Sequence, residues 1–521
     1  MNNVRVLSRM LLGLLAFVLL TPATALAHGK LKSSAPAAGS HLSVAPTELR
    51  LTFTEATEVT FTRIELFGPD SQMVALGPIA FTDGDARRVV VAAIRGALRE
   101  GTYTVAWQMA GADGHPVRDR FTFMVMPGAS GLADPPTAGV ATPVPGEAAA
   151  GVVAPGQTPP PAAHHDPATM PDQAGFDAES PLYVAVRWMT FTALLVALGA
   201  VAFHLFVLGF LRRAEGPARE PDSPMLAPAS MRAAALGLWA VALLGVAALL
   251  RLYAQSYALH GAESALDPVL VATMLRRTMW GWGWMLQAVG VAVAVAGFLM
   301  ARRGRRSGWA IATLGVVALA FTPALSGHAA AVPRLTSLAV LADGLHVIGA
   351  GGWLGSLLFV VVVGLPAAYR LPEGERGGGA AQLINAFSPT ALAFAGIVAA
   401  TGVFSAWLHL DAVSALWQSE YGRMLLLKLG ILSVVAGTGA YNWLRVKPAL
   451  GNIEGAVRIR RSGTLELAVG VLVVVVTAVL VATPTPMDAT MADAAAETHA
   501  PSGTTDAAVA TPSAPAALNE P

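Results

Sequence analysis

The stretch SLAVLADGLHVIGAGGWLGSLLFVVVVG, residues 337–364, contains one acidic residue, one histidine and otherwise apolar or small side chains. It is longer than the roughly 20 apolar residues that an α-helix needs to cross a bilayer. Such segments recur between residues 181 and 483, so the sequence predicts an α-helical polytopic membrane domain with eight transmembrane helices. The predicted spans are 183–211, 232–256, 281–301, 308–327, 337–364, 389–410, 424–444 and 463–483.

The composition of the whole chain agrees with a membrane protein. Of 521 residues, 54% are hydrophobic and 13% are charged, whereas a soluble domain carries roughly 25% charged residues. The chain has no cysteine, which excludes disulfide scaffolds, thiolate zinc sites, iron–sulfur clusters and thiolate blue-copper centres. A formal net charge of +1 gives no sign of nucleic-acid binding. We therefore expect the lipid bilayer as a partner and no nucleic acid.

Residues 1–27 have the features of a secretory signal peptide. Arg5 and Arg9 precede a short apolar core, and Ala25-Leu26-Ala27 is a small-x-small cleavage site. Cleavage there makes His28 the mature N-terminus. An uncleaved anchor helix is the alternative, but the short apolar run and the position of the alanines favour cleavage.

Residues 28–127 have the pattern of an exported β domain. Apolar side chains alternate with polar ones in three stretches between Gly, Pro and Asp turns, and this period of two predicts strands of a small antiparallel β-sandwich or barrel. About 100 residues suffice for one core. The alternating residues are Leu49, Leu51 and Phe53, then Tyr103, Val105 and Trp107, then Phe121, Phe123 and Val125.

Two segments have a composition typical of disorder. Residues 128–180 carry ten prolines with many Ala and Gly and no Lys or Arg, which predicts a disordered linker between the β domain and the membrane domain. Residues 484–521 are rich in Ala, Thr and Pro and contain no basic residue, which predicts a disordered C-terminal tail.

The basic residues predict the orientation of the membrane domain. If the first domain is exported, the even number of spans returns the C-terminal tail to the outside. The loops then predicted to lie inside carry most of the arginines, as the positive-inside rule requires. We therefore expect a multi-pass protein of the cytoplasmic (inner) membrane, with both the N-terminal domain and the tail on the periplasmic or extracellular side. The inner basic residues are Arg212, Arg213, Arg219, Arg302, Arg303, Arg305, Arg306, Arg370, Arg376, Arg445, Lys447, Arg458, Arg460 and Arg461.

The exported domain contains candidate metal ligands. A free His28 offers its α-amine and its imidazole, which can chelate one metal ion. Asp113 and His115, in Ala112-Asp-Gly-His-Pro116, point the same way if that segment is extended, and they add a carboxylate oxygen and a second imidazole. Three nitrogens and one oxygen suit tetragonal Cu(II). The alternative, that this segment is only a turn, is weakened by the exposed His28.

These residues also carry a family resemblance. The stretches His28-Gly-Lys-Leu-Lys-Ser-Ser-Ala-Pro, Leu51-Thr-Phe-Thr-Glu55 and Gly111-Ala-Asp-Gly-His-Pro-Val117 resemble the CopC family of periplasmic copper-binding proteins. The resemblance implies a small Greek-key β-barrel that binds Cu(II) through His28, Asp113 and His115. It implies a weaker ligand role, or a role beside the ligands, for Glu55.

The membrane part resembles the CopD family. The matching stretches are Ser326-Gly-His-Ala329, Asp343-Gly-Leu-His-Val-Ile-Gly-Ala-Gly-Gly-Trp-Leu-Gly355 and Tyr421-Gly-Arg-Met-Leu-Leu-Leu-Lys428. The whole chain therefore resembles a CopC–CopD fusion protein. This family is associated with copper uptake across the cytoplasmic membrane, and the resemblance implies copper transport, copper resistance or both.

Ionisable residues inside a membrane are costly and usually functional. Asp343 and His346 lie three residues apart and so on one helix face, and with His328 they form the predicted copper path near the outer surface. His409 and Lys428 are weaker candidates. The alternative for His409 is an ordinary position at the membrane interface. The alternatives for Lys428 are that its side chain extends to the interface or pairs with Asp343. We expect His260 in the outer loop after the second span.

The leading functional hypothesis is a copper transporter that captures Cu(II) outside, receives copper from periplasmic carriers and passes it, as Cu(I), into the membrane domain. No catalytic residue and no further cofactor is expected. The main alternative is a copper sequestration or resistance factor without transport. An oxidative enzyme with a copper bound by its N-terminal His, and a haem-binding membrane protein, are the remaining alternatives.

Overall fold

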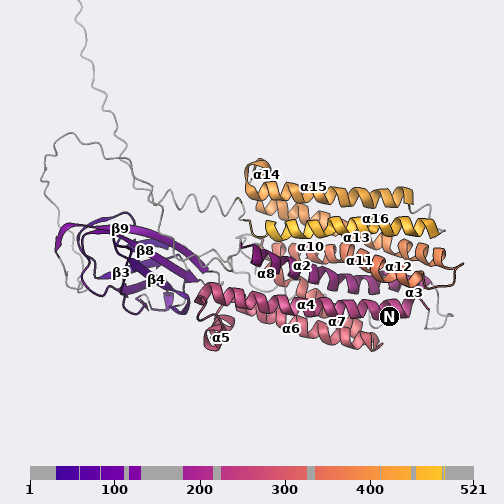
Figure 1. The fold of residues 1–521 in the computed structure, drawn as a ribbon, viewed down its shortest axis with the longest axis horizontal. Helices are drawn as coiled ribbons and strands as arrows, with labels where there is room; N and C mark the ends of the chain where they lie inside the picture. The colour runs from indigo at the N-terminus through magenta and orange to yellow at the C-terminus, as the bar shows by residue number, and fades with distance from the viewer. Residues whose placement is uncertain are drawn as a thin grey trace, which may run out of the picture.

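The computed structural model describes a β domain followed by a long bundle of helices, and the two lie end to end along the longest axis of the molecule (Figure 1). The connecting linker predicted for 128–180 falls mostly outside the described part. The described residues are 31–54, 56–57, 59–82, 84–110, 116–130, 180–214, 224–325, 335–410, 412–446, 453–483 and 486.

Two sheets form the β domain. One has the strand order β1-β3-β7-β6 and the other β2-β9-β8-β4-β5. All the described pairings between these strands are antiparallel except that of β2 with β9. The strands are β1 Leu31–Ala35, β2 His41–Val44, β3 Glu48–Phe53, β4 Arg63–Phe67, β5 Met73–Val74, β6 Ala80–Phe81, β7 Val89–Ala93, β8 Gly101–Ala110 and β9 Pro116–Ser130, with short helical turns η1 Val59–Phe61 and η2 Gly84–Ala86.

The alternating apolar residues build the core of this domain. Leu49, Leu51 and Phe53 on β3 are buried, and so are Tyr103, Val105 and Trp107 on β8. Each set projects from one face of its strand, because successive side chains in a strand point to opposite faces. The prediction of a small β-sandwich is thus confirmed.

The bundle is formed by long apolar helices. Within the described residues, eight are long and apolar enough to cross a membrane, as predicted, although most extend beyond the predicted limits. The elements are α2 Pro181–Ala202, η3 Phe203–Leu208, α3 Gly209–Ala214, α4 Leu226–His260, α5 Pro268–Arg277, α6 Met279–Arg302, α7 Arg306–Ala320, α8 Thr322–Leu325, α10 Thr336–Ala350, η4 Gly351–Gly355, α11 Ser356–Phe359, η5 Val360–Gly364, α12 Leu365–Ala368, α13 Arg376–His409, α14 Ala415–Gln418, α15 Glu420–Tyr441, η6 Asn442–Val446 and α16 Ile453–Leu480.

The sixth predicted span shows how the limits differ. The sequence placed its start at residue 389, where a proline usually limits a helix, but α13 begins at Arg376 and contains Pro389. The first turns of α13 are buried at Gly379, Ala380 and Leu383. Packing of these residues against neighbouring helices offsets the loss of one backbone hydrogen bond at the proline.

Glycines allow the central helices to approach closely. A Cβ atom on Gly199 of α2 would lie 2.3 Å from the carbonyl carbon of Gly355 in η4, and one on Gly355 would lie 2.2 Å from the carbonyl oxygen of Leu195. Small residues permit such backbone contact between membrane helices. This crossing lies next to the helix that carries Asp343 and His346.

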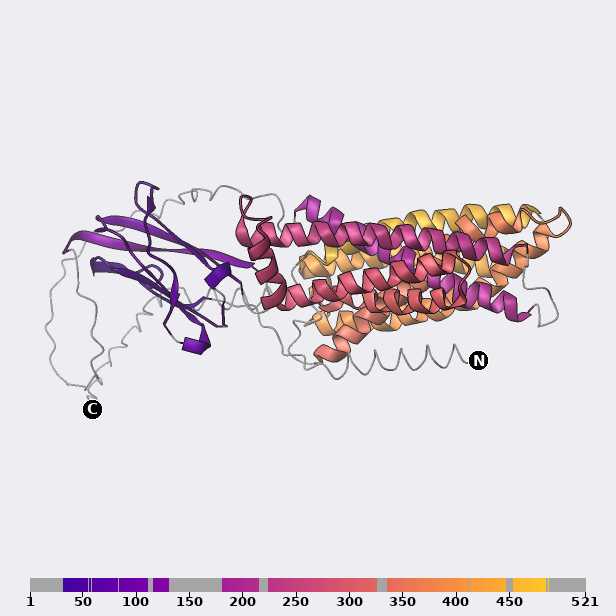
Figure 2. The same cartoon turned by 90° about the horizontal axis from the view of Figure 1, so that it is seen from below.

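Figure 2 shows that the β domain covers only one end of the bundle, where α4 ends and α5 lies across the helices. We call this the β-domain end. The helices α10 and α15 begin there and α13 ends there (Figure 1). Residues near the start of α10 and α15 and at the end of α13 therefore share this end of the molecule.

Candidate functional site

Five predicted copper ligands lie outside the described residues. They are His28, Glu55, Asp113, His115 and His328. The residues on either side of the Asp113–His115 segment are described. Ala110 at the end of β8 is paired with Pro116 at the start of β9, so the segment that connects them leaves and re-enters the sheet at one point.

That point touches the helix bundle. Ala110 is fully buried in a cluster that also contains Phe61 of the β domain and Leu259, Met274 and Trp280 of the helices. Covering this apolar surface favours a fixed contact between the two domains. The segment predicted to hold copper therefore begins at the interface with the membrane domain.

Polar side chains of the β domain cap helix α4 at the same interface. Gln108 donates a hydrogen bond from Nε2 to the carbonyl oxygen of Leu259 at 3.1 Å, and Arg118 donates from Nη2 to that of Ala258 at 2.6 Å. Arg63 donates to the carbonyl oxygen of His260. The last carbonyls of a helix lack partners within the helix and carry partial negative charge, so guanidinium and amide donors suit them well.

This capping corrects the position predicted for His260. It is the last residue of α4 and is buried, whereas the sequence placed it in a loop. The charged Arg251 and the polar Gln255, Ser256 and His260 end the purely apolar run, but the donors from the β domain stabilise the helix to its last residue. No pattern in the sequence indicates that β4, β8 and β9 meet this helix end.

The aromatic residues at the start of α6 divide between two environments. Trp282 is 60% exposed from the protein, which suits the interfacial belt expected there. Trp280 is instead buried in the cluster with Ala110, and Trp284 donates from Nε1 to the carbonyl oxygen of Ala248 at 2.8 Å. Of these three tryptophans, Trp282 is therefore the one that faces outward.

Asp343 and His346 lie on α10, within the first turns from the β-domain end. At 1.5 Å per residue they are roughly 10 and 15 Å from the start of the helix. Both are partly buried by the protein. Gly402 of α13 faces the imidazole, since a Cβ there would lie 3.5 Å from His346 Cε1.

The hydrogen bonds of Thr401 define the state of the His346 ring. Thr401 Oγ1 donates its one proton to the carbonyl oxygen of Ile397 at 2.6 Å, and it lies 3.0 Å from His346 Nδ1. A hydroxyl that has donated its proton must accept from Nδ1–H. The neutral ring therefore presents the lone pair of Nε2, which is the form that binds a metal.

His409 and Lys428 lie at the same end of the bundle as Asp343. In the described part no ion pair within 4.0 Å joins Asp343 and Lys428. His409 donates from Nδ1 to the carbonyl oxygen of Ser405 at 2.8 Å, so its Nε2 also keeps a lone pair when the ring is neutral. Its ring centroid lies 6.4 Å from that of Tyr421.

These residues do not close around an ion. Among the described residues, no three His, Cys, Asp or Glu side chains are arranged to hold a metal ion. Asp343, His346, His409 and Lys428 are thus gathered at one end of the bundle without forming a complete ligand set. His328, the further predicted member, lies outside the described residues.

His204 differs from the histidines at the β-domain end. It lies in η3 towards the opposite end of the bundle. Its Nδ1 is 3.0 Å from Ser230 Oγ, and its Nε2 is 3.3 Å from Arg212 Nη1. Its ring stacks on Trp309 with centroids 3.8 Å apart. Both ring nitrogens have partners, which fits a packing role.

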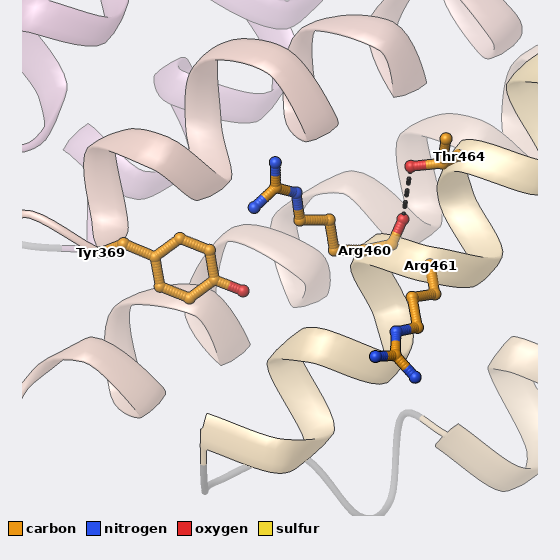
Figure 3. Close-up of a pocket in the computed structure, with 4 residues that line it drawn as sticks. All are labelled: Tyr369, Arg460, Arg461 and Thr464. Carbon is orange, nitrogen blue, oxygen red and sulfur yellow. Dashed lines mark hydrogen bonds between the residues drawn. The ribbon is translucent and has the colours of Figure 1, made fainter.

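A cleft lies at the end of the bundle opposite the β domain. It is lined by Tyr369, Arg460, Arg461 and Thr464. Figure 3 shows Arg460 extending towards the ring of Tyr369 and Arg461 pointing away from it, while Thr464 donates to the carbonyl oxygen of Arg460 at 2.7 Å. Burial raises the pKa of Tyr369, and Arg460 partly offsets this. The cleft is basic and lies far from Asp343.

Comparison with known proteins assigns both parts of the chain. Residues 31–126 match the CopC domain, residues 176–335 the copper resistance protein D-like N-terminal domain, and residues 381–480 copper resistance protein D. Copper resistance protein C of Pseudomonas syringae pv. tomato is 33% identical over 117 residues, which are 22% of this chain and 91% of that protein. The chain belongs to the CopC–CopD copper-resistance family.

A relative with both parts also exists in this CopC–CopD family. The copper transport protein CutJ of Bacillus subtilis is 26% identical over 479 residues, covering 91% of this chain and 77% of CutJ. The crystal structure of PcoC, a methionine-rich copper resistance protein from Escherichia coli, matches with 36% identity over 19% of this chain and 99% of PcoC, with a TM-score of 0.17. The three family matches and the match to CutJ together show a CopC–CopD fusion of a copper transport and resistance family.

Proposed function

We propose that the chain captures Cu(II) outside the cytoplasmic membrane and imports copper through its helix bundle. His28, Asp113 and His115 bind the ion in the exported domain, with Glu55 as a weaker ligand, and a signal peptide over 1–27 exposes His28. Periplasmic copper carriers supply the ion. Copper is the cargo in this proposal, and no catalytic role is assigned to the chain.

The observation that carries the proposal is the contact between Ala110 and the ends of the helices. Ala110 lies three residues before Asp113, and it is buried in one cluster with Leu259 and Trp280. This contact, three residues before Asp113, supports the proposal that the exported domain delivers copper to the membrane domain. A carrier that only sequestered copper would have no need for this contact.

The membrane step uses the groups at the β-domain end of the bundle. His346 offers a neutral imidazole with Nε2 unprotonated, as derived from the Thr401 hydrogen bonds. Asp343 supplies negative charge that offsets the charge of the entering ion, and His328, His409 and Lys428 complete the proposed path. The opposite end is rich in arginines, including Arg460 and Arg461, which supports a cytoplasmic position for that end by the positive-inside rule.

The test is uptake of radiolabelled copper into proteoliposomes that contain the full chain. We expect metal-dependent flux in the wild type and a loss of that flux in His346→Ala. His41→Ala is the matched control, because His41 is exposed on β2 and lies outside the predicted ligand set. Flux that is absent in the wild type, or equal in His346→Ala, contradicts transport by this path and favours sequestration.

A further inference from the structure

His260 is a histidine at the interface whose ring has one unused nitrogen. Its Nδ1 lies 3.1 Å from Ser256 Oγ, one helical turn earlier. Its Nε2 is buried and has no hydrogen-bond partner, and the residue as a whole is only 4% exposed. Buried polar groups nearly always have a partner, so this nitrogen requires an explanation.

The ring lies between the two domains. Its centroid is 5.7 Å from that of Phe61 in the β domain. Phe61 in turn belongs to the cluster with Ala110, Leu259 and Met274. His260 is therefore next to the end of β8, from which the chain continues into the Asp113–His115 segment.

Two charged side chains act on the ring with opposite sign. They are Arg63 and Asp267, and Arg63 has the larger effect of the two. Arg63 donates a hydrogen bond to the carbonyl oxygen of His260, and Asp267 accepts hydrogen bonds from the backbone N–H groups of Val269 and Leu270.

We propose that His260 Nε2 is a copper ligand that receives the ion from the exported domain. This inference depends on the proposed function. In the tautomer with the proton on Nδ1, that proton is donated to Ser256 and the Nε2 lone pair faces the interface. Transfer forms one bond between copper and Nε2 and breaks one bond between copper and a ligand of the exported domain. No electron is transferred and the oxidation state stays the same.

Pulsed electron paramagnetic resonance of the full chain, loaded with Cu(II) alone in detergent, tests this ligand because it counts coordinated imidazoles. We expect His260→Gln to show one coordinated imidazole fewer than the wild type. Met274→Leu is the matched control, since Met274 is buried in the same cluster and the change nearly preserves volume. It should retain the wild-type count.

A second measurement needs no variant and so does not depend on how His260→Gln folds. Bound copper with ascorbate as the reductant and dioxygen as the oxidant oxidises its own histidine ligands, and peptide mass spectrometry then locates the added oxygen. We expect oxidation at His260 and none at His41, which is exposed, or at His204, whose nitrogens both have partners. Oxidation missing at His260 overturns the inference.

The outcomes separate this inference from the proposed function. If Cu(II) binds to the wild type but His260→Gln leaves the imidazole count unchanged, His260 is not a ligand and copper capture by the exported domain stands. If the wild type binds no Cu(II), both the capture step and the His260 ligand are wrong.

Discussion

Arg118 on strand β9 donates a hydrogen bond from Nη2 to the carbonyl oxygen of Ala258, at 2.6 Å, and so joins the β domain to the end of helix α4. The same guanidinium donates from Nε to Gln108 Oε1 at 2.9 Å, which orients the Gln108 amide towards Leu259. One side chain therefore contacts the helix directly and also positions a second donor. This relationship holds the end of β8 and the start of β9 against the end of α4.

Arg118→Ala should loosen the contact between the domains. A hydrogen bond to a charged group contributes about 1.5–3 kcal/mol, and partial exposure of Arg118 places the expected loss at the lower end. Hydrogen–deuterium exchange at residues 258–261 should increase. Arg120→Ala is the control, because Arg120 lies two residues further along the same strand and is exposed. Equal exchange in both variants would show that the cap does not hold α4.

Gly355→Ala should destabilise the membrane domain. The added Cβ would lie 2.2 Å from the carbonyl oxygen of Leu195, so the helices must separate, and overpacking of this kind costs about 1–3 kcal/mol. The melting temperature in detergent should fall. Gly437→Ala is the control, since nothing lies within 4 Å of its added Cβ and alanine is the better helix former. An unchanged melting temperature for Gly355→Ala would contradict the close crossing.

Thr401→Val should impair copper transport without removing a ligand. Valine keeps the shape of threonine but cannot accept the hydrogen bond from His346 Nδ1, so the ring loses its orientation and its fixed tautomer. Partners of this kind typically contribute about 10- to 100-fold in metal affinity. Copper flux into proteoliposomes should fall, while Thr401→Ser should retain it. Similar losses in both variants would argue against the hydroxyl as the cause.

One added residue before His28 should weaken Cu(II) binding strongly, because it removes the α-amine from the chelate. Asp113→Ala should cost less affinity than His115→Ala, since an imidazole is the better ligand for Cu(II). Competition titration with a chromophoric Cu(II) chelator measures all three variants. Unchanged affinity in the extended chain contradicts the N-terminal chelate, and negligible losses in both substitutions would mean that the segment is only a turn.

Binding of Cu(II) at this chelate should also weaken as the pH falls. The imidazoles and the α-amine bind the ion only when unprotonated, and their ordinary pKa values are about 6.5 and about 7.7–8.0. Protons compete with the ion below these values. The same titration, repeated between pH 8 and pH 6, should show a steep loss of affinity. A flat profile would indicate that carboxylates rather than nitrogens hold the metal.

The fold was predictable because buried apolar residues follow simple periodic patterns along the chain. Alternation at Leu49, Leu51 and Phe53 indicated a strand, and long apolar runs indicated the spans. The first and last residues of the helices were less predictable where tertiary contacts extend a helix, as at Pro389 and His260. Asp343 and His346 were chosen from the sequence as membrane candidates because ionisable groups in apolar runs are conspicuous, and their role stays a prediction. The contacts of Arg63, Gln108 and Arg118 with the end of α4 were not predictable, since surface polar residues on strands look alike in the sequence.

The sequence by itself determined the two-part architecture, the eight spans and the copper family, because apolar periodicity and short motifs are local properties of the chain. Only the tertiary structure decided that the end of β8 lies against α4, that Thr401 leaves His346 Nε2 unprotonated, and that His260 is buried with one nitrogen unused. These relationships join residues far apart in the sequence, such as His260 and Arg63. They arise from the requirement that helix ends and buried polar groups find partners, which local patterns do not identify.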